Sequence, residues 1–245
     1  MRNIKLILEY DGTNYRGWQK QKDGRTVQGQ VEKAIREVTK EDDIEVIGCS
    51  RTDSGVHSRA YTANFKTNSS IPGEKFLYAI NNKLPKDIVV IFSEEVEEDF
   101  HSRYDSKGKT YCYTILNRRV PSAIHRNYVY LVKEDLDLDL IIEGSKYFEG
   151  THDFEAFRTL GSSVKTTVRT IHKVSIEKEK DIIKIYVTGD GFLYNMVRIM
   201  VGTLIEVGRK KIKPNDIKNI IEKKDRILAG IVVPPMGLEL LEVFY

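Results

Sequence analysis

An aspartate at position 53 stands in a segment whose composition is that of a reactive loop. Asp53 lies within Ser50-Arg51-Thr52-Asp53-Ser54-Gly55-Val56-His57, directly after a short β-prone stretch. Glycine and small hydroxyl residues let the backbone turn sharply and let a ligand come close, and loops held by a rigid sheet often carry reactive groups. A carboxylate here either caps a turn or acts as a nucleophile or base. The segment by itself leaves both interpretations open.

An arginine in an apolar segment is the second candidate for chemistry. Residues 192–207 are apolar on nearly all faces of a helix, which predicts a buried helix, yet Arg198 stands in its middle. Because burial of an unpaired charge is costly, Arg198 should face a carboxylate, a bound phosphate or a cleft opening. A structural ion pair in the core is the alternative. If the carboxylate is that of Asp53, the pair would keep Asp53 ionised and oriented.

Tyrosines and basic residues suggest a surface for a polyanion. Tyr111 and Tyr113 alternate on a predicted strand, so they face the same side of a sheet. They are either core residues or a surface on which an unstacked base is held. Local basic runs occur in residues 103–126, 158–173 and 208–226, although the net charge is only +3. Such runs are solvated surface or the footprint of a nucleic acid.

Several other classes of protein have little support in the sequence. Cys49 and Cys112 have no Cys-x-x-Cys spacing, and the five histidines show no ligand-type spacing, so a disulfide framework or a metal site is not expected. Glycine-rich phosphate loops are absent, so we expect no cofactor. The N-terminus does not resemble a signal peptide and no apolar run is long enough for a membrane span, which predicts a cytoplasmic location.

The elements that must position these residues form two similar halves. In residues 1–103 we expect strands at 3–10, 44–47, 60–65 and 88–92, with helices behind Thr26 and behind Pro72. This β-α-β-β-α-β order is that of a ferredoxin-like unit. The acidic run at 94–99 is interpreted as a solvated connector without a chemical role.

The second half, residues 104–245, repeats that order. Strands are predicted at 110–116, 168–177, 181–188 and 238–244, with helices at 136–148 and 192–207 and a shorter helix after Pro214. The predicted fold is therefore α+β, with two ferredoxin-like or RRM-like halves that share an extended mixed or antiparallel sheet. Helices would cover one face of this sheet and a basic cleft would open on the other.

The sequence resembles the TruA family of tRNA pseudouridine synthases. Arg51-Thr52-Asp53-Ser54-Gly55-Val56-His57 is similar to that family's Arg-Thr-Asp-Ala-Gly-Val-His motif. Further matches run along the whole chain in the family's order. They are Tyr10-Asp11-Gly12-Thr13-x-Tyr15-x-Gly17-Trp18-Gln19, Thr26-Val27-Gln28-Gly29, Phe100-His101-x-Arg103, Lys109-Thr110-Tyr111-x-Tyr113, Gly150-Thr151-His152-Asp153-Phe154, Phe192-Leu193-Tyr194-Asn195-Met196-Val197-Arg198 and Pro234-Pro235-Met236-Gly237-Leu238.

The resemblance implies a reaction and a set of residues. Asp53 would be the catalytic aspartate, Tyr111 would pack against the target uracil and remove its C5 proton, and Arg198 would pair with Asp53. Arg51 would take the family's base-flipping role. The resemblance also implies a homodimer, a tRNA substrate and target uridines at positions 38 to 40 of the anticodon stem-loop. Together with the basic runs, it predicts substrate contacts from Arg51, His57, Arg103, Lys109, Arg158 and Arg169.

Some residues depart from the family pattern. Cys49-Ser50 stand where Ala-Gly is common, Ser54 and Ser58 replace two alanines, and Val233 replaces the alanine common before Pro234. These departures leave open a paralogue that acts on a different uridine or RNA. A non-catalytic RNA-binding protein is the alternative from another class, since two RRM-like halves with basic runs suffice for binding. A tRNA nuclease is disfavoured because the sequence has no histidine pair or metal cluster.

Overall fold

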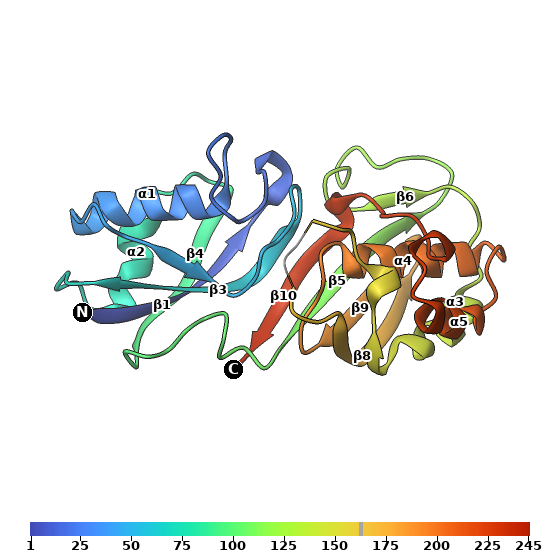
Figure 1. Cartoon of the computed structure of the whole chain (residues 1–245). Coiled ribbons are helices and arrows are strands. Elements are labelled where there is room, and N and C mark those ends of the chain that lie inside the picture. The colour runs from blue at the N-terminus through green and yellow to red at the C-terminus, as the bar shows by residue number, and fades with distance from the viewer. Residues whose placement is uncertain (162–163) are drawn as a thin grey trace. The chain divides into compact units, whose positions relative to one another are not determined.

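The computed structural model describes residues 1–161 and 164–245, which form two compact units. Unit 1 consists of residues 1–107 together with 239–245, and unit 2 consists of residues 108–238 (Figure 1). The C-terminal strand, which we expected in the second half, is thus grouped with the first unit. Both units combine helices with β-sheet, so the predicted α+β class is confirmed.

Unit 1 has the predicted β-α-β-β-α-β order. Its strands follow the order β4-β1-β3-β10, and β2 also pairs with β3. β1 is antiparallel to both β3 and β4, while α1 and α2 cover one face of the sheet (Figure 1). The elements are β1 (Arg2–Tyr10), α1 (Val27–Thr39), β2 (Val46–Gly48), β3 (His57–Thr67), α2 (Phe76–Asn81), β4 (Ile88–Val96) and β10 (Leu238–Phe244), with short 3-10 helices at Gly12–Asn14 and Gly73–Lys75.

Helix α1 begins where the sequence predicts. The Thr26 side chain accepts a hydrogen bond from the backbone N–H of Gly29 (3.3 Å), which satisfies one of the free donors at the helix start. Apolar side chains at helical spacing, including Val27, Val31 and Ile35, are fully buried. Burial of this face fixes the helix on the sheet. The helix ends at Thr39, and the next residue, Lys40, adopts the left-handed conformation that caps it.

Strand β3 carries two partners on one side, one after the other. The β2 residues Val46–Gly48 pair antiparallel with Phe65 to Ala63, near the end of β3. At the start of β3, His57 and Ser58 pair in parallel with Glu239 and Leu240 of β10. The loop that carries Asp53 joins β2 to β3 and therefore enters β3 beside β10. Pairing at this point holds the end of the loop.

The interpretation of residues 94–99 as a solvated connector is wrong for the start of the run, which belongs to a strand. Glu94 and Glu95 lie in β4 and form ion pairs with residues of β1: Lys5 Nζ is 2.9 Å from Glu94, and Arg2 is 2.7 Å from Glu95. Antiparallel pairing places Lys5 opposite Glu94, and Arg2 reaches Glu95 diagonally, which a reading of charge density along the chain does not reveal. The acids therefore stabilise the edge of the sheet.

Unit 2 keeps the predicted order and adds short elements. Its strands follow the order β5-β9-β8-β7, all antiparallel, and β6 lies parallel to β5. The elements are β5 (Gly108–Asn117), β6 (Tyr130–Val132), α3 (Leu138–Ser145), β7 (Gly150–Asp153), β8 (Val168–Glu179), β9 (Ile182–Gly189), α4 (Met196–Gly208) and α5 (Asp216–Lys223), with 3-10 helices at Lys146–Phe148, Glu155–Phe157, Arg226–Leu228 and Pro235–Gly237. The sequence did not predict β6 and β7, because strands this short carry almost no periodic signal.

Helix α4 begins later than predicted. We expected a helix from Phe192, but α4 begins at Met196, because Asn195 has φ 62° and ψ 8° and so interrupts the helical conformation. Of the residues before it, Leu193 is buried but Tyr194 is 44% exposed, so the apolar run does not continue the buried helix. From Met196 onward the helix is buried on most sides, as expected, and α3 packs against it, with the Ile141 side chain directly beside Gly208.

Candidate active site

Asp53 lies at a tight turn in the loop between β2 and β3. Its side chain is half-buried, and its backbone carbonyl accepts a hydrogen bond from the N–H of Val56 (3.2 Å). Gly55 has φ 79°, a conformation that favours glycine. The turn therefore presents a half-buried carboxylate on a short, constrained backbone.

Residues 10–18 hold this turn through hydrogen bonds to residues 52–55. The backbone N–H of Trp18 donates to the carbonyl of Thr52 (3.1 Å), and the hydroxyl groups of Tyr10 and Thr52 are 2.8 Å apart. Tyr15 contributes its carbonyl oxygen, which accepts from the N–H of Gly55 (3.2 Å) and from the hydroxyl of Ser54 (3.1 Å). Residues on both sides of Asp53 are thus tied to one segment, so its backbone position is well defined.

Two glycines permit this close approach. A Cβ at Gly12 would lie 2.0 Å from the carbonyl oxygen of Val56, and one at Gly17 would lie 2.5 Å from that of Thr52. Gly17 also has φ 81°. No side chain fits at these distances without displacing the loop. Residues 10–18, which the sequence identified only as part of a family pattern, therefore support the Asp53 turn, and the spacing of the two glycines was the available signal.

An aromatic group packs beneath the start of the loop. The rings of Trp18 and Tyr61 stack with centroids 3.8 Å apart, and both are buried. The Tyr61 hydroxyl donates to the carbonyl of Ser50. A Cβ at Gly48 would meet the Tyr61 hydroxyl at 2.2 Å, so the backbone is in direct contact with these rings where β2 ends. This packing fixes the path of the chain toward Arg51.

His57 lies within the support of the loop. It is buried, with 6% of its surface exposed, and its Nδ1 accepts the backbone N–H of Gly12 (3.0 Å). The same nitrogen is 3.1 Å from a carboxylate oxygen of Asp11. These contacts join the end of the Asp53 turn to residues 11–12. Direct contact between His57 and a substrate stays a prediction.

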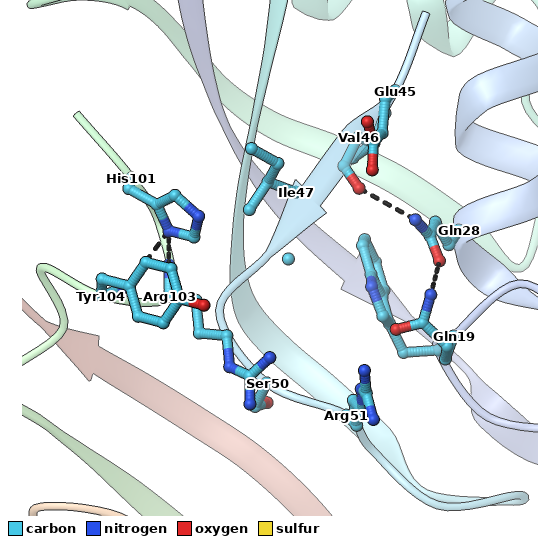
Figure 2. A pocket seen from close by; sticks show the side chains of 12 residues that line it. Gln19, Gln28, Glu45, Val46, Ile47, Ser50, Arg51, His101, Arg103 and Tyr104 are labelled. Carbon is cyan, nitrogen blue, oxygen red and sulfur yellow. Dashed lines mark hydrogen bonds between the residues drawn. The ribbon is translucent and has the colours of Figure 1, made fainter. Parts of the chain in front are cut away.

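Arg51 and Arg103 are both exposed and line one pocket in unit 1 (Figure 2). The structure thus brings together two of the arginines that the sequence predicted to contact the substrate. Arg51 is two residues from Asp53, and a two-residue span covers at most about 7 Å. One wall of the pocket is therefore formed by the same loop that carries Asp53.

In unit 2, Tyr111 and Tyr113 of β5 have different environments. Tyr111 lies opposite Val187 of β9, has 8% of its surface exposed, and meets Phe192 edge-on with ring centroids 5.1 Å apart. Tyr113 is completely buried and donates its hydroxyl to the carbonyl of Pro234 (2.7 Å). Burial raises the pKa of Tyr113 far above its ordinary value. Tyr113 is therefore a neutral core residue, and Tyr111 remains the candidate for contact with a base.

Arg198 is half-buried at the start of α4 and is not enclosed in a core. Its Nε donates to the carbonyl of Val233 (2.7 Å), and an Nη donates to the side-chain oxygen of Asn195 (2.6 Å). Asn195 is held in turn, since its amide nitrogen donates to the hydroxyl of Thr159 (2.9 Å). Part of the Arg198 surface is accessible, and neutral acceptors bind part of the guanidinium, so the expectation that it faces a carboxylate, a phosphate or a cleft opening stays a prediction. These contacts orient the group without neutralising its charge.

The other predicted contact residues of unit 2 do not share one environment. Lys109 is buried, with 7% exposed. Arg158 forms a two-pronged ion pair with Glu155 (2.8 and 2.7 Å), which raises the pKa of Arg158. Arg169 is half-buried and donates to the carbonyls of Thr166 and Val168. The guanidinium of Arg158 is therefore already engaged by a carboxylate, which competes with any phosphate.

Neither a metal centre nor a membrane span is found in residues 1–161 and 164–245. Within these residues, no group of three or more histidine, cysteine, aspartate and glutamate side chains is arranged to hold a metal ion. None of the helices described is long and apolar enough to cross a membrane.

Comparison with known proteins identifies the family. The family model described as tRNA pseudouridine synthase matches residues 6–105 and 145–245. The chain is 63% identical to tRNA pseudouridine synthase A 2 of Clostridium perfringens, 60% identical to tRNA pseudouridine synthase A of Clostridium acetobutylicum and 56% identical to that of Acetivibrio thermocellus, in each case over 100% of both chains. A solved Cbf5-Nop10-Gar1 complex contains a chain that is 13% identical, with a TM-score of 0.38 over 98% of this chain and 57% of that one.

The sequence relatives match over the complete length of the chain, and the family model covers both the Asp53 turn and α4. The resemblance predicted from the motifs is therefore confirmed: the chain belongs to the TruA family of tRNA pseudouridine synthases, isomerases that act on tRNA.

Proposed function

We propose that this enzyme converts uridine to pseudouridine at positions 38 to 40 of the tRNA anticodon stem-loop, with Asp53 as the nucleophile on a flipped-out nucleotide. The observation that carries the proposal is the Asp53 turn: a half-buried carboxylate tied through Thr52, Ser54 and Gly55 to residues 15–18. A reacting group must be held within a small tolerance of its target, and such a turn meets that requirement. The target position rests on the family resemblance.

The chemistry requires a carboxylate and no redox partner. The bond between N1 of uracil and C1′ of ribose breaks, and its electron pair leaves with the base. Asp53 bonds to or stabilises C1′, much as a carboxylate does in glycoside hydrolysis. After the uracil rotates, C5 bonds to C1′, the C5 proton is lost, and N1 gains a proton. Substrate and product are isomers, so the reaction needs no electron donor or group donor.

The other residues have roles that follow from their chemistry. Tyr111, whose ring is fixed by Phe192, packs against the uracil. Its hydroxyl accepts or relays the C5 proton. Arg198 carries a positive charge that keeps Asp53 ionised. A base stacked in RNA cannot be reached by the carboxylate, so the target must leave the stack, and Arg51 fills the vacated space.

Substrate binding and assembly complete the proposal. Arg103, Lys109 and Arg169 contact the RNA backbone, His57 supports the loop beside it, and Arg158 contributes once its pair with Glu155 opens. A homodimer that binds one tRNA with both subunits, and a cytoplasmic location, rest on the family resemblance.

Replacement of Asp53 tests the proposal. Wild-type protein and Asp53→Asn are incubated with an unmodified tRNA transcript labelled with tritium at C5 of uracil, and tritium release is followed. The new pseudouridines are then mapped position by position. We expect release by Asp53→Asn to fall to background, because asparagine has no ionised nucleophile, while affinity for tRNA changes by no more than about twofold. Wild-type protein should modify positions 38 to 40.

Asp43→Asn is the matched control. Asp43 is exposed and lies outside the turn, so the same change of charge should leave the rate unaltered. Full activity of Asp53→Asn would exclude Asp53 as the nucleophile. Pseudouridine at a different uridine, with Asp53→Asn inactive, would keep the chemistry and exclude only the target position, as expected of a paralogue.

A further inference from the structure

A pocket of ≈ 290 Å³ opens in unit 1 beside the start of the Asp53 loop (Figure 2). Three parts of the chain form it: Trp18 and Gln19 together with Gln28 at the start of α1, the segment 45–51 that contains β2, and the loop 101–104. Among the residues that line it are Gln28, Ser50, Arg51, His101, Arg103 and Tyr104.

The inner walls of this pocket are fixed by hydrogen bonds. The Gln28 amide nitrogen donates to the carbonyl of Val46 (2.9 Å), and its oxygen accepts from the side chain of Gln19 (2.8 Å) (Figure 2). On the other side, the buried Ser102 hydroxyl donates to the carbonyl of Ile47 (2.7 Å), which fastens the loop 101–104 to β2. The pocket is therefore preformed, and a ligand need not order its walls.

The rim carries an exposed aromatic ring. Tyr104 has 76% of its surface exposed, which is high for a large side chain with an apolar ring. The His101 ring lies against it with centroids 4.2 Å apart, and the Arg103 guanidinium is 5.8 Å from the Tyr104 ring. His101 Nδ1 accepts the backbone N–H groups of both Arg103 and Tyr104 (3.2 Å each), so the turn is held in place. An exposed, fixed ring beside a cation is a surface on which a nucleobase stacks.

The charges at the pocket favour an anion. Arg51 and Arg103 are exposed, and the acidic residue in the lining is Glu45, also exposed. Arginine binds phosphate with two parallel hydrogen bonds, which makes it the usual partner of a nucleic-acid backbone. The pocket thus combines a stacking ring with phosphate-binding groups, and one of these groups, Arg51, lies two residues before Asp53 in the chain.

We propose that this pocket binds an unpaired nucleotide of the substrate RNA that neighbours the target uridine. Its base stacks on Tyr104 and His101, and its phosphate is bound by Arg103, while the neighbouring Arg51 enters the space that the target base leaves. The inference rests on the proposed function in one respect, namely that the target uridine reacts at Asp53. Because the pocket adjoins the loop, a bound neighbour keeps the RNA strand open after the target has left the stack.

Replacement of the exposed tyrosine tests the pocket, with a close match as control. Tyr104→Ala removes the stacking ring, and because this side chain is exposed we expect the variant to fold like wild type. Tyr78→Ala is the control: Tyr78 is 62% exposed on α2, has Lys75 at 5.6 Å from its ring, and is not part of the pocket lining. Affinity for an unmodified tRNA transcript is measured for each variant in the full-length protein.

We expect Tyr104→Ala to weaken tRNA binding by about 5- to 100-fold, the range for loss of one stacked base, and Tyr78→Ala to leave it unchanged. Transcripts with a single abasic site at each nucleotide flanking the target locate the partner. One of these sites should weaken binding to wild-type protein by a similar factor and have no further effect on Tyr104→Ala.

Two outcomes would overturn the pocket assignment: binding of Tyr104→Ala within twofold of the control, or additive effects of Tyr104→Ala with every abasic site. The measurement is an affinity and does not require turnover. If Asp53→Asn proves active, the proposed function fails while the affinity comparison still decides the pocket. If Asp53→Asn is inactive and Tyr104→Ala binds normally, the proposed function stands and the pocket proposal fails.

Discussion

Tyr111 and Tyr113 show how little the residue type determines at a site. They are two positions apart on β5, so the pattern of the strand treats them alike. Tyr113 is fully buried and its hydroxyl donates to the Pro234 carbonyl, whereas the Tyr111 ring is fixed edge-on by Phe192. One hydroxyl is used in the core, and we propose that the other acts on the substrate.

The two tyrosines should respond oppositely to the same substitution. Tyr113→Phe leaves the half-buried Pro234 carbonyl without its donor, so we expect a loss of about 0.5–1.5 kcal/mol in the free energy of unfolding with a near-normal rate. Tyr111→Phe keeps the ring and its contact with Phe192, so the rate should fall by roughly 10²- to 10⁴-fold. Urea unfolding and single-turnover tritium release measure the two quantities. A normal rate for Tyr111→Phe would remove its hydroxyl from the mechanism.

At the scale of elements, the start of α4 is built around one residue in an unusual conformation. Asn195 has φ 62°, which stops the helix, and its side-chain oxygen accepts from Arg198 one turn into α4. The left-handed conformation costs most residues about 1–2 kcal/mol, and asparagine tolerates it better than others. Asn195 thus combines a backbone function with the orientation of Arg198.

Two substitutions at Asn195 separate these functions. Asn195→Gly relieves the backbone, whereas Asn195→Ala keeps the strain, so the alanine variant should be less stable than the glycine variant by about 1 kcal/mol. Both lose the acceptor for Arg198, so we expect both to slow the reaction by about tenfold or more, with the glycine variant fully folded. Thermal unfolding and tritium release supply the readouts. Wild-type activity in Asn195→Gly would restrict Asn195 to ending the helix.

At the scale of the whole molecule, ion pairs in both units make stability depend on pH. The pKa of Glu95 is lowered by its hydrogen bond with Arg2, and that of Glu134 by its hydrogen bond with Arg209. The pKa of Asp153 is lowered mainly by Lys224, 2.8 Å away, and by the Thr167 hydroxyl. A carboxylate with a lowered pKa stabilises the fold above its ordinary pKa. That contribution is lost as the pH falls through the folded-state pKa.

Asp153→Asn tests this dependence in unit 2. At pH 7 we expect the variant to be less stable than wild type by about 0.5–1 kcal/mol, a small value because the Lys224 side chain is 53% exposed. Near pH 3 and below, the difference should shrink, because wild-type Asp153 becomes protonated there. Asp43→Asn, at an exposed site, should show no such trend. A stability difference that stays constant from pH 7 to pH 2 would contradict the assignment.

The sequence by itself determined the class of fold and much of its outline. Apolar residues at helical spacing and the Thr26 cap predicted α1, and the order of elements predicted a ferredoxin-like arrangement in unit 1. These features are local, since caps and periodicity act within a few residues of the chain. The ordered motifs also identified the family, which the full-length relatives confirm.

Only the tertiary structure decided how the site is supported. Tyr10 and Thr52 are 42 positions apart, and Lys5 of β1 is 89 positions from Glu94, its ion-pair partner in β4. No local pattern predicts such pairs. Contacts between residues far apart in the chain also determine three further features. These are the start of α4 at Met196, the short strands β6 and β7, and the partial burial of Arg198. Asp53 was identifiable as a candidate from its motif, but the turn that fixes it exists because two distant glycines let residues 12–17 reach its backbone.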